Sequence, residues 1–119
     1  MIDYLSEIEN KINFKLPKTY SNFLLSMGSN VYEITDTSIT LYPLCNLLEI
    51  NNSYKVQEFD PSAFLIAQDG DLGFYIRKES DEMIFELGLG SLGSLNMRPK
   101  GTNIYDFMEK IREDYIDDE

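Results

Sequence analysis

The side chains that most often carry out catalysis are scarce in this sequence. It contains no histidine and a single cysteine, Cys45. A Ser-His-Asp triad, a Cys-His pair and an imidazole-ligated zinc site are therefore excluded. With no imidazole to activate its thiol, Cys45 is expected to be a small core residue rather than a nucleophile. Carboxylates are abundant, but no spacing among them singles out an acid–base pair for hydrolysis.

One glycine-rich stretch has the spacing of a nucleotide-binding loop. Gly88, Gly90 and Gly93 spell the G-x-G-x-x-G fingerprint of dinucleotide sites. That loop works by opening a helix whose N-terminus holds a pyrophosphate, inside a parallel βαβ unit. Because Pro99 and Gly101 follow here and block a helix, no nucleotide cofactor is predicted. We expect the glycines to lie in a long loop, residues 88–101, beside the sheet.

A second stretch, DGDLG at residues 69–73, offers two aspartates of the kind that bind calcium. A calcium loop needs further oxygen ligands at alternating positions and a glutamate at the twelfth. Here aromatic and aliphatic residues occupy the middle, and Ser80 stands at the twelfth position. An Asp-Gly pair between two apolar runs predicts a hairpin turn instead, and no metal site is predicted.

Net charge is the strongest compositional signal. The chain has 21 acidic and 10 basic residues, which give a formal net charge of −11 at pH 7. Such a surface repels phosphate backbones, so direct binding to nucleic acid is not expected. The same field attracts a basic partner and speeds its association, although solubility alone also accounts for an acidic composition.

The apolar spacing predicts two helices before the first strand. Residues 2–12 and 16–28 each carry an apolar stripe at helical spacing. Pro17 suits the first helical position, so the second helix is expected to start there and to close at Gly28 with a left-handed backbone. The two helices are expected to form a helical hairpin.

The pattern then changes from helices to strands. Apolar runs predict five strands, over residues 31–34, 38–44, 64–68, 72–78 and 83–87. The last three strands are expected to be consecutive and antiparallel, joined by the Asp69-Gly70 turn and by the turn ESDE, residues 79–82. An irregular apolar pattern over residues 47–59, broken by NNS, predicts one short helix.

A final helix is predicted near the C-terminus. Asn103, followed three residues later by Asp106, has the pattern of a helix start. The apolar face of this helix is formed by Ile104, Phe107, Met108, Ile111 and Tyr115. Together the elements predict one α+β domain over residues 1–119, with an N-terminal helical hairpin, a mostly antiparallel β-sheet and a C-terminal helix packed on the sheet.

The sequence shows no signal for a membrane or for export. No apolar run approaches the roughly 18 residues that cross a bilayer, and the first residues carry acids rather than a basic leader. A single unpaired cysteine suits a reducing compartment. We therefore expect a cytoplasmic protein with no membrane partner.

The order of these motifs resembles the SUKH superfamily. The resemblance covers most of the chain and rests on Leu16, Pro17, Tyr20, Phe23, Leu24 and Gly28, then residues 64–67, Asp69-Gly70 and Phe74-Tyr75. The superfamily includes bacterial immunity proteins of polymorphic toxin systems and the domain of a fungal cell-wall assembly regulator. The resemblance implies a non-enzymatic protein without a cofactor. Such a protein binds a cognate toxin, often a nuclease or deaminase, in the cytoplasm of the producing cell.

An acidic domain of this kind is suited to cover the basic active site of a toxin that acts on nucleic acid. The predicted contact surface combines the hairpin turn, an exposed face around Tyr75, the ESDE turn and the acidic C-terminal end. Its residues are Asp69, Asp71, Tyr75, Glu79, Asp81, Glu82, Asp114, Asp117 and Asp118. Tyr75 is expected to be exposed there and to act as the anchor.

Two other functions stay open on the sequence alone. A regulatory protein–protein interaction module would have several partners and weaker, salt-tolerant binding. A small-ligand-binding domain, or an enzyme that uses carboxylates, would be stabilised by its ligand in a thermal-shift screen.

Overall fold

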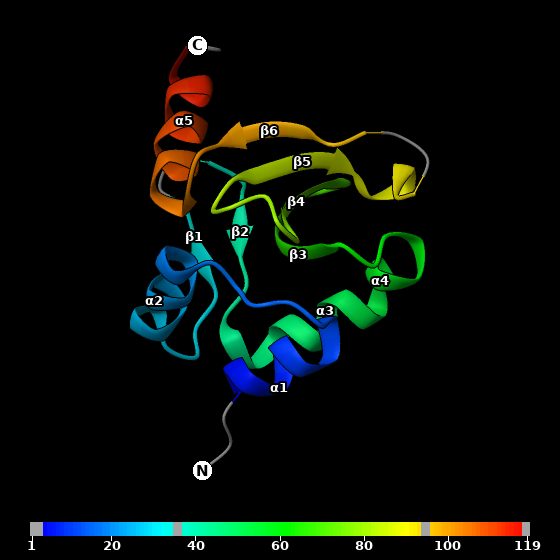
Figure 1. Cartoon of the computed structure of the whole chain (residues 1–119). Helices are drawn as coiled ribbons and strands as arrows, with labels where there is room; N and C mark the ends of the chain where they lie inside the picture. The colour runs from blue at the N-terminus through cyan, green and yellow to red at the C-terminus, as the bar shows by residue number, and fades with distance from the viewer. Residues whose placement is uncertain (1–3, 35–36, 94–95, 118–119) are drawn as a thin grey trace.

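The computed structural model describes residues 4–34, 37–93 and 96–117, with side chains as far as Asp114. Helices and strands alternate unevenly along the chain, with helices at both ends (Figure 1). In order they are α1 (Tyr4–Ile12), α2 (Lys18–Met27), β1 (Tyr32–Glu33), β2 (Thr40–Leu41), the 3-10 helix η1 (Leu44–Asn46), α3 (Leu47–Ser53), α4 (Val56–Phe59), β3 (Ala63–Asp69), β4 (Leu72–Arg77), β5 (Ile84–Gly88), the 3-10 helix η2 (Leu89–Ser91), β6 (Arg98–Gly101) and α5 (Ile104–Asp117).

Within the described residues, six strands form one sheet in the order β1 to β6. Each strand is antiparallel to the next, so the fold needs no crossover connection. Asp69 pairs with Leu72 at the end of β3 and β4, which confirms the predicted hairpin turn. The sheet, the N-terminal helices and a C-terminal helix in contact with β6 confirm the predicted α+β class.

The sheet buries apolar side chains on both faces because alternate residues of a strand point to opposite sides. Phe64 of β3 and Phe74 of β4 belong to the larger core, which also holds the buried faces of α1, α2 and α5. Leu65 and Tyr75 point to the other face and meet Val56 of α4 in a smaller core. The central strands are therefore apolar at nearly every position.

The second helix begins one residue later than predicted. Pro17 has an extended backbone, with φ −57° and ψ 142°, and its carbonyl accepts a hydrogen bond from the Ser21 amide, so it precedes the helix rather than opening it. Gly28 follows the last helical residue with a positive φ of 76°, as predicted, but its ψ of −148° differs from that of a left-handed helical cap. Of the two N-terminal helices, α1 lies against η1 and α2 lies against α5.

Two predictions for the middle of the chain are wrong. Residues 47–59 form two helices, because Lys55 has a left-handed φ of 54° and breaks the chain between them. The predicted loop at residues 88–101 contains the strand β6, which pairs with β5. Pro99 lacks an N–H to donate, but β6 is an edge strand, where a proline is tolerated.

The end of the chain follows its prediction. Asn103 Oδ1 accepts from the Asp106 amide at 2.9 Å, and Asp106 Oδ2 accepts from the Thr102 amide at 2.8 Å. These bonds satisfy free N–H groups at the start of α5. The predicted apolar positions from Ile104 to Ile111 are buried, whereas Tyr115 lies outside the residues whose side chains are described. In the described part of the chain, none of the helices is both long and apolar enough to cross a bilayer.

Candidate partner-binding surface

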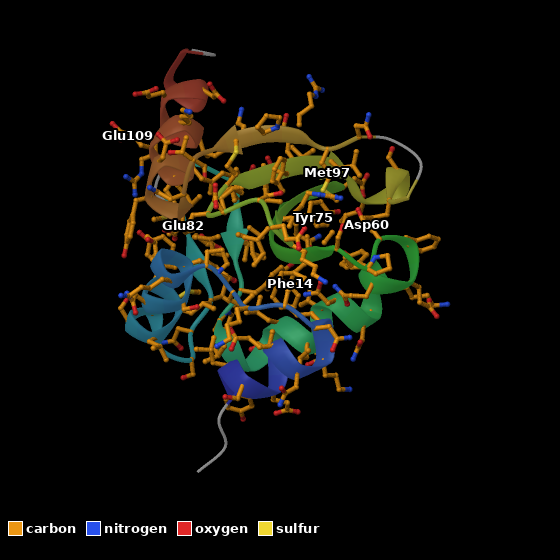
Figure 2. The ribbon with its side chains drawn as sticks, in the orientation of Figure 1. Phe14, Asp60, Tyr75, Glu82, Met97 and Glu109 are labelled. Carbon is orange, nitrogen blue, oxygen red and sulfur yellow. The ribbon has the colours of Figure 1, made fainter. Side chains whose placement is uncertain are left out.

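Tyr75 is in the core, so the prediction that it is exposed is wrong. Its relative exposure is 0%, and it lies in the interior of the molecule (Figure 2). Gly73 makes room for it, because a Cβ at that position would lie 2.5 Å from the Tyr75 hydroxyl oxygen. That hydroxyl has no hydrogen-bond partner among the described residues. Burial, with a smaller effect of Tyr54, raises the pKa of Tyr75 to about 12.

Other tyrosines lie beside the β3–β4 turn. The Tyr42 hydroxyl donates to Gln68 Oε1, and Gln68 Nε2 donates to the Tyr54 hydroxyl at 3.1 Å and to the Gly70 carbonyl at 3.0 Å. Burial and then Tyr54 raise the pKa of Tyr42. Tyr54 is 38% exposed, so it supplies the solvent-facing aromatic ring that the sequence assigned to Tyr75.

The two aspartates of that turn differ in their surroundings. Asp69 is half-buried and its Oδ1 accepts from Ser38 Oγ at 2.7 Å. Asp71 is exposed, and its backbone carbonyl accepts from the Leu89 amide at 2.7 Å. The turn is therefore fixed to neighbouring segments on both sides and presents the Asp71 carboxylate to solvent.

The β4–β5 turn holds a second group of the predicted acids. Glu79 and Asp81 are exposed and have left-handed φ values of 65° and 54°. Glu82 has a structural role, because its carboxylate accepts from the Thr19 amide at 2.8 Å and from the Thr19 hydroxyl at 2.9 Å. It therefore caps the N-terminus of α2, where free N–H groups and the helix dipole favour a negative charge.

The predicted acids do not form one surface. The two turns lie at opposite ends of β4, and six residues of extended chain span about 20 Å. Asp114 forms an ion pair with Lys100 of β6, which neutralises part of its charge. The side chains of Asp117 and Asp118 lie outside the described residues, so their part in the surface stays a prediction.

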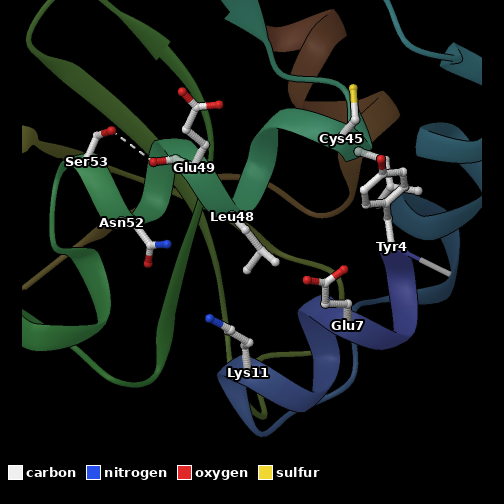
Figure 3. Close-up of a pocket in the computed structure, with 9 residues that line it drawn as sticks. Tyr4, Glu7, Lys11, Cys45, Leu48, Glu49, Asn52 and Ser53 are labelled. Atoms are coloured by element: carbon white, nitrogen blue, oxygen red, sulfur yellow. Dashed lines mark hydrogen bonds between the residues drawn. The ribbon is translucent and has the colours of Figure 1, made fainter. Parts of the chain in front are cut away.

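A groove between α1 and α3 was missed by the sequence reasoning (Figure 3). Its volume is about 610 Å³, and Leu48 lies between the two helices with Glu7 and Lys11 on the opposite wall. Cys45 lines it and is exposed, so the prediction of a core cysteine is wrong. Leu47 takes the fully buried position nearby, while the Cys45 thiol faces outward and lies 3.2 Å from Asn46 Oδ1.

Asn51 is the polar residue that holds α3 against the sheet. It is 1% exposed, its Nδ2 donates to the Leu65 carbonyl at 2.9 Å, and its Oδ1 accepts from the Leu65 amide at 2.8 Å. Gln57 Nε2 donates to Asn51 Oδ1 at 3.1 Å and to the Ala63 carbonyl at 2.8 Å. Two side-chain amides thus continue the ladder along β3 where β2 ends.

An ion pair fixes the end of β4 to the loop before β3. Arg77 Nη1 lies 2.7 Å from Asp60 Oδ2, and Arg77 Nη2 donates to Ser62 Oγ at 2.9 Å. Burial alone would raise the pKa of Asp60, but the hydrogen bonds from Ser62 and Arg77 outweigh it and lower the pKa. Figure 2 places Asp60 near Met97, whose sulfur lies 3.3 Å from Arg77 Nη1.

Among the described residues, no three His, Cys, Asp or Glu side chains are placed to hold a metal ion together. The chain belongs to the SMI1/KNR4 family (SUKH-1), which matches residues 2–110. SUKH is a family of immunity proteins to polymorphic toxins, and these are generally non-catalytic. A comparison with curated proteins finds no match.

Proposed function

We propose that this protein binds a cognate polymorphic toxin that acts on nucleic acid and neutralises it by covering its basic surface. Membership of the SUKH family carries the proposal. Supporting it, the chain carries a net charge of −11, and the exposed carboxylates of Asp71, Glu79 and Asp81 lie on turns that project from the sheet. The protein acts without catalysis or a cofactor, in the cytoplasm of the toxin-producing cell.

Charge complementarity explains how such a protein reaches its target. A nuclease or deaminase must present a basic surface to attract phosphates, and that surface equally attracts an acidic protein. Attraction between opposite surfaces raises the association rate, whereas buried aromatic contacts slow dissociation. The complex is therefore expected to form fast at low salt and to persist through its apolar contacts.

A protection experiment tests this function. Any basic C-terminal toxin domain that a gene beside this one encodes is expressed in a sensitive host, with or without the chain. Growth is expected only when the chain is present. A triple variant in which Asp71, Glu79 and Asp81 become Asn, Gln and Asn keeps the described fold and should protect less well. Equal killing with and without the wild-type chain would contradict the proposal.

A further inference from the structure

Three aromatic rings from distant parts of the sequence meet at the surface of the molecule. Phe23 of α2 has its ring centroid 5.8 Å from that of Tyr32 in β1 and 5.8 Å from that of Tyr105 in α5. The interplanar angles are 81° and 87°, so both contacts are edge-to-face. Phe23 is 7% exposed and Tyr105 is 52% exposed. These three residues are called the aromatic patch.

The aromatic patch is fixed before any partner arrives. Phe23 belongs to the larger core, Tyr32 packs against that core, and Tyr105 contacts the Phe23 ring, so part of the freedom of Tyr105 is already lost before it is covered. A rigid tyrosine offers a large contact area and a polar tip, which is why tyrosine is common among the residues that dominate binding energies. Its neighbours Ile104 and Phe107 are buried in the core, whereas half of Tyr105 stays exposed.

Carboxylates surround the aromatic patch. Thr19 lies one helical turn before Phe23 on the same side of α2, and it binds the Glu82 carboxylate through its amide and its hydroxyl. The ESDE turn is thereby held beside the patch. Glu109 is exposed and lies one turn after Tyr105 on α5, and Figure 2 shows Glu109 and Glu82 on this side of the molecule. Negative charge therefore lies on two sides of the rings.

The turn supplies a further carboxylate. Exposed Asp81 directly precedes Glu82. Two exposed positive charges also lie around the aromatic patch: Lys18 directly precedes Thr19 on α2, and Arg112 lies two turns after Tyr105 on α5. A cation is favoured over an aromatic face and beside carboxylates. The aromatic patch and the carboxylates around it therefore match a positively charged side chain of a partner.

We infer that the aromatic patch and the ESDE turn form the docking surface for a basic segment of the partner protein. An arginine or lysine of that segment lies against Tyr105, with its charge toward Glu82 and Glu109. A second copy of this chain is a poor occupant, because each copy carries a charge of −11. The inference rests on the proposed function and specifies which surface of the domain performs it.

The test uses nona-arginine, with blocked ends, titrated into the ¹⁵N-labelled chain at low salt. Shift changes are expected to concentrate at Phe23, Tyr32, Tyr105 and residues 79–82. Tyr105→Ala should weaken binding at least fivefold, and Tyr105→Phe should stay within twofold because it keeps the ring. Phe59→Ala is the matched control and should leave the affinity unchanged, since Phe59 is 56% exposed on α4, and Figure 1 shows α4 on the far side of the sheet from α2 and α5.

A gain of affinity gives an independent readout. Arg112→Gln removes a positive charge close to the aromatic patch, so it should tighten nona-arginine binding about twofold to threefold. Shift changes centred on Tyr54 and Asp71, or equal affinities of Tyr105→Ala and Phe59→Ala, would overturn the inference.

The toxin domain used in the protection experiment separates this inference from the proposed function. If it binds the wild-type chain, Tyr105→Ala should weaken that complex at least tenfold. An unchanged affinity would refute the docking surface and leave the proposed function standing. If the wild-type chain fails to bind it, the proposed function fails, and the docking surface fails with it.

Discussion

Removing the buried side-chain amide of Asn51 should destabilise the protein far more than removing the exposed side-chain amide of Asn52. In Asn51→Ala the N–H and the C=O of Leu65 both lose a partner at a position with 0% exposure. Each unsatisfied buried group costs about 1–3 kcal/mol, so the two together cost about 3 kcal/mol. With an unfolding entropy of about 0.25 kcal/mol/K for a chain of this length, Tm should fall by about 12 °C.

The matched control is Asn52→Ala, one residue along the same helix. Asn52 is exposed and lines the groove between α1 and α3, so its loss should change the free energy of unfolding by about 0.5 kcal/mol or less. Urea denaturation followed by circular dichroism measures both variants. If Asn51→Ala lies within about 1 kcal/mol of Asn52→Ala, the assignment of Asn51 as the residue that completes the edge of β3 is wrong.

The remaining predictions concern single side chains. Glu82→Ala should lower the free energy of unfolding by about 1–2 kcal/mol, because α2 loses its cap at Thr19, and thermal denaturation measures this loss. Tyr75→Phe should leave stability unchanged or raise it by up to about 1 kcal/mol, since its hydroxyl has no partner in the described structure, and spectrophotometric titration should lose a tyrosine that ionises near pH 12. The lowered pKa of Asp60 stabilises the fold above pH 3.8, its unfolded value, and that contribution is lost as the pH falls through the lower folded value. Asp60→Asn should therefore weaken the fold at pH 7, because Arg77 loses its charged partner, and should flatten the fall in stability below pH 4. An unchanged dependence of stability on pH in acid would contradict this.

Most of the fold follows from local signals in the sequence. Continuous apolar runs predicted β3 to β5, the Asp69-Gly70 pair predicted their hairpin, and Asn103 with Asp106 predicted the start of α5. The edge strand β6 was missed, because Pro99 and its basic neighbours have none of the apolar alternation that marks a strand. Such residues are tolerated at a sheet edge, where one side of the backbone is free.

The site was less predictable than the fold. Tyr75 is buried rather than exposed, because its neighbours on β4 are apolar and Gly73 leaves space for its ring in the interior. Glu82 has an acidic side chain like its neighbours, yet its role depends on Thr19, sixty-three residues away. Asn51 belongs to the polar NNS stretch, residues 51–53, which interrupts the apolar pattern. Long-range hydrogen bonds of this kind leave no local signal in a sequence.

The central claim is that this acidic domain binds a basic toxin, and its affinity for that toxin tests the claim most directly. Isothermal titration calorimetry with a catalytically inactive form of any toxin domain that a neighbouring gene encodes measures it at low and at high salt. We expect a one-to-one complex with a Kd of about 1–100 nM, weaker at high salt. Absence of binding at micromolar concentrations in low salt would contradict the claim.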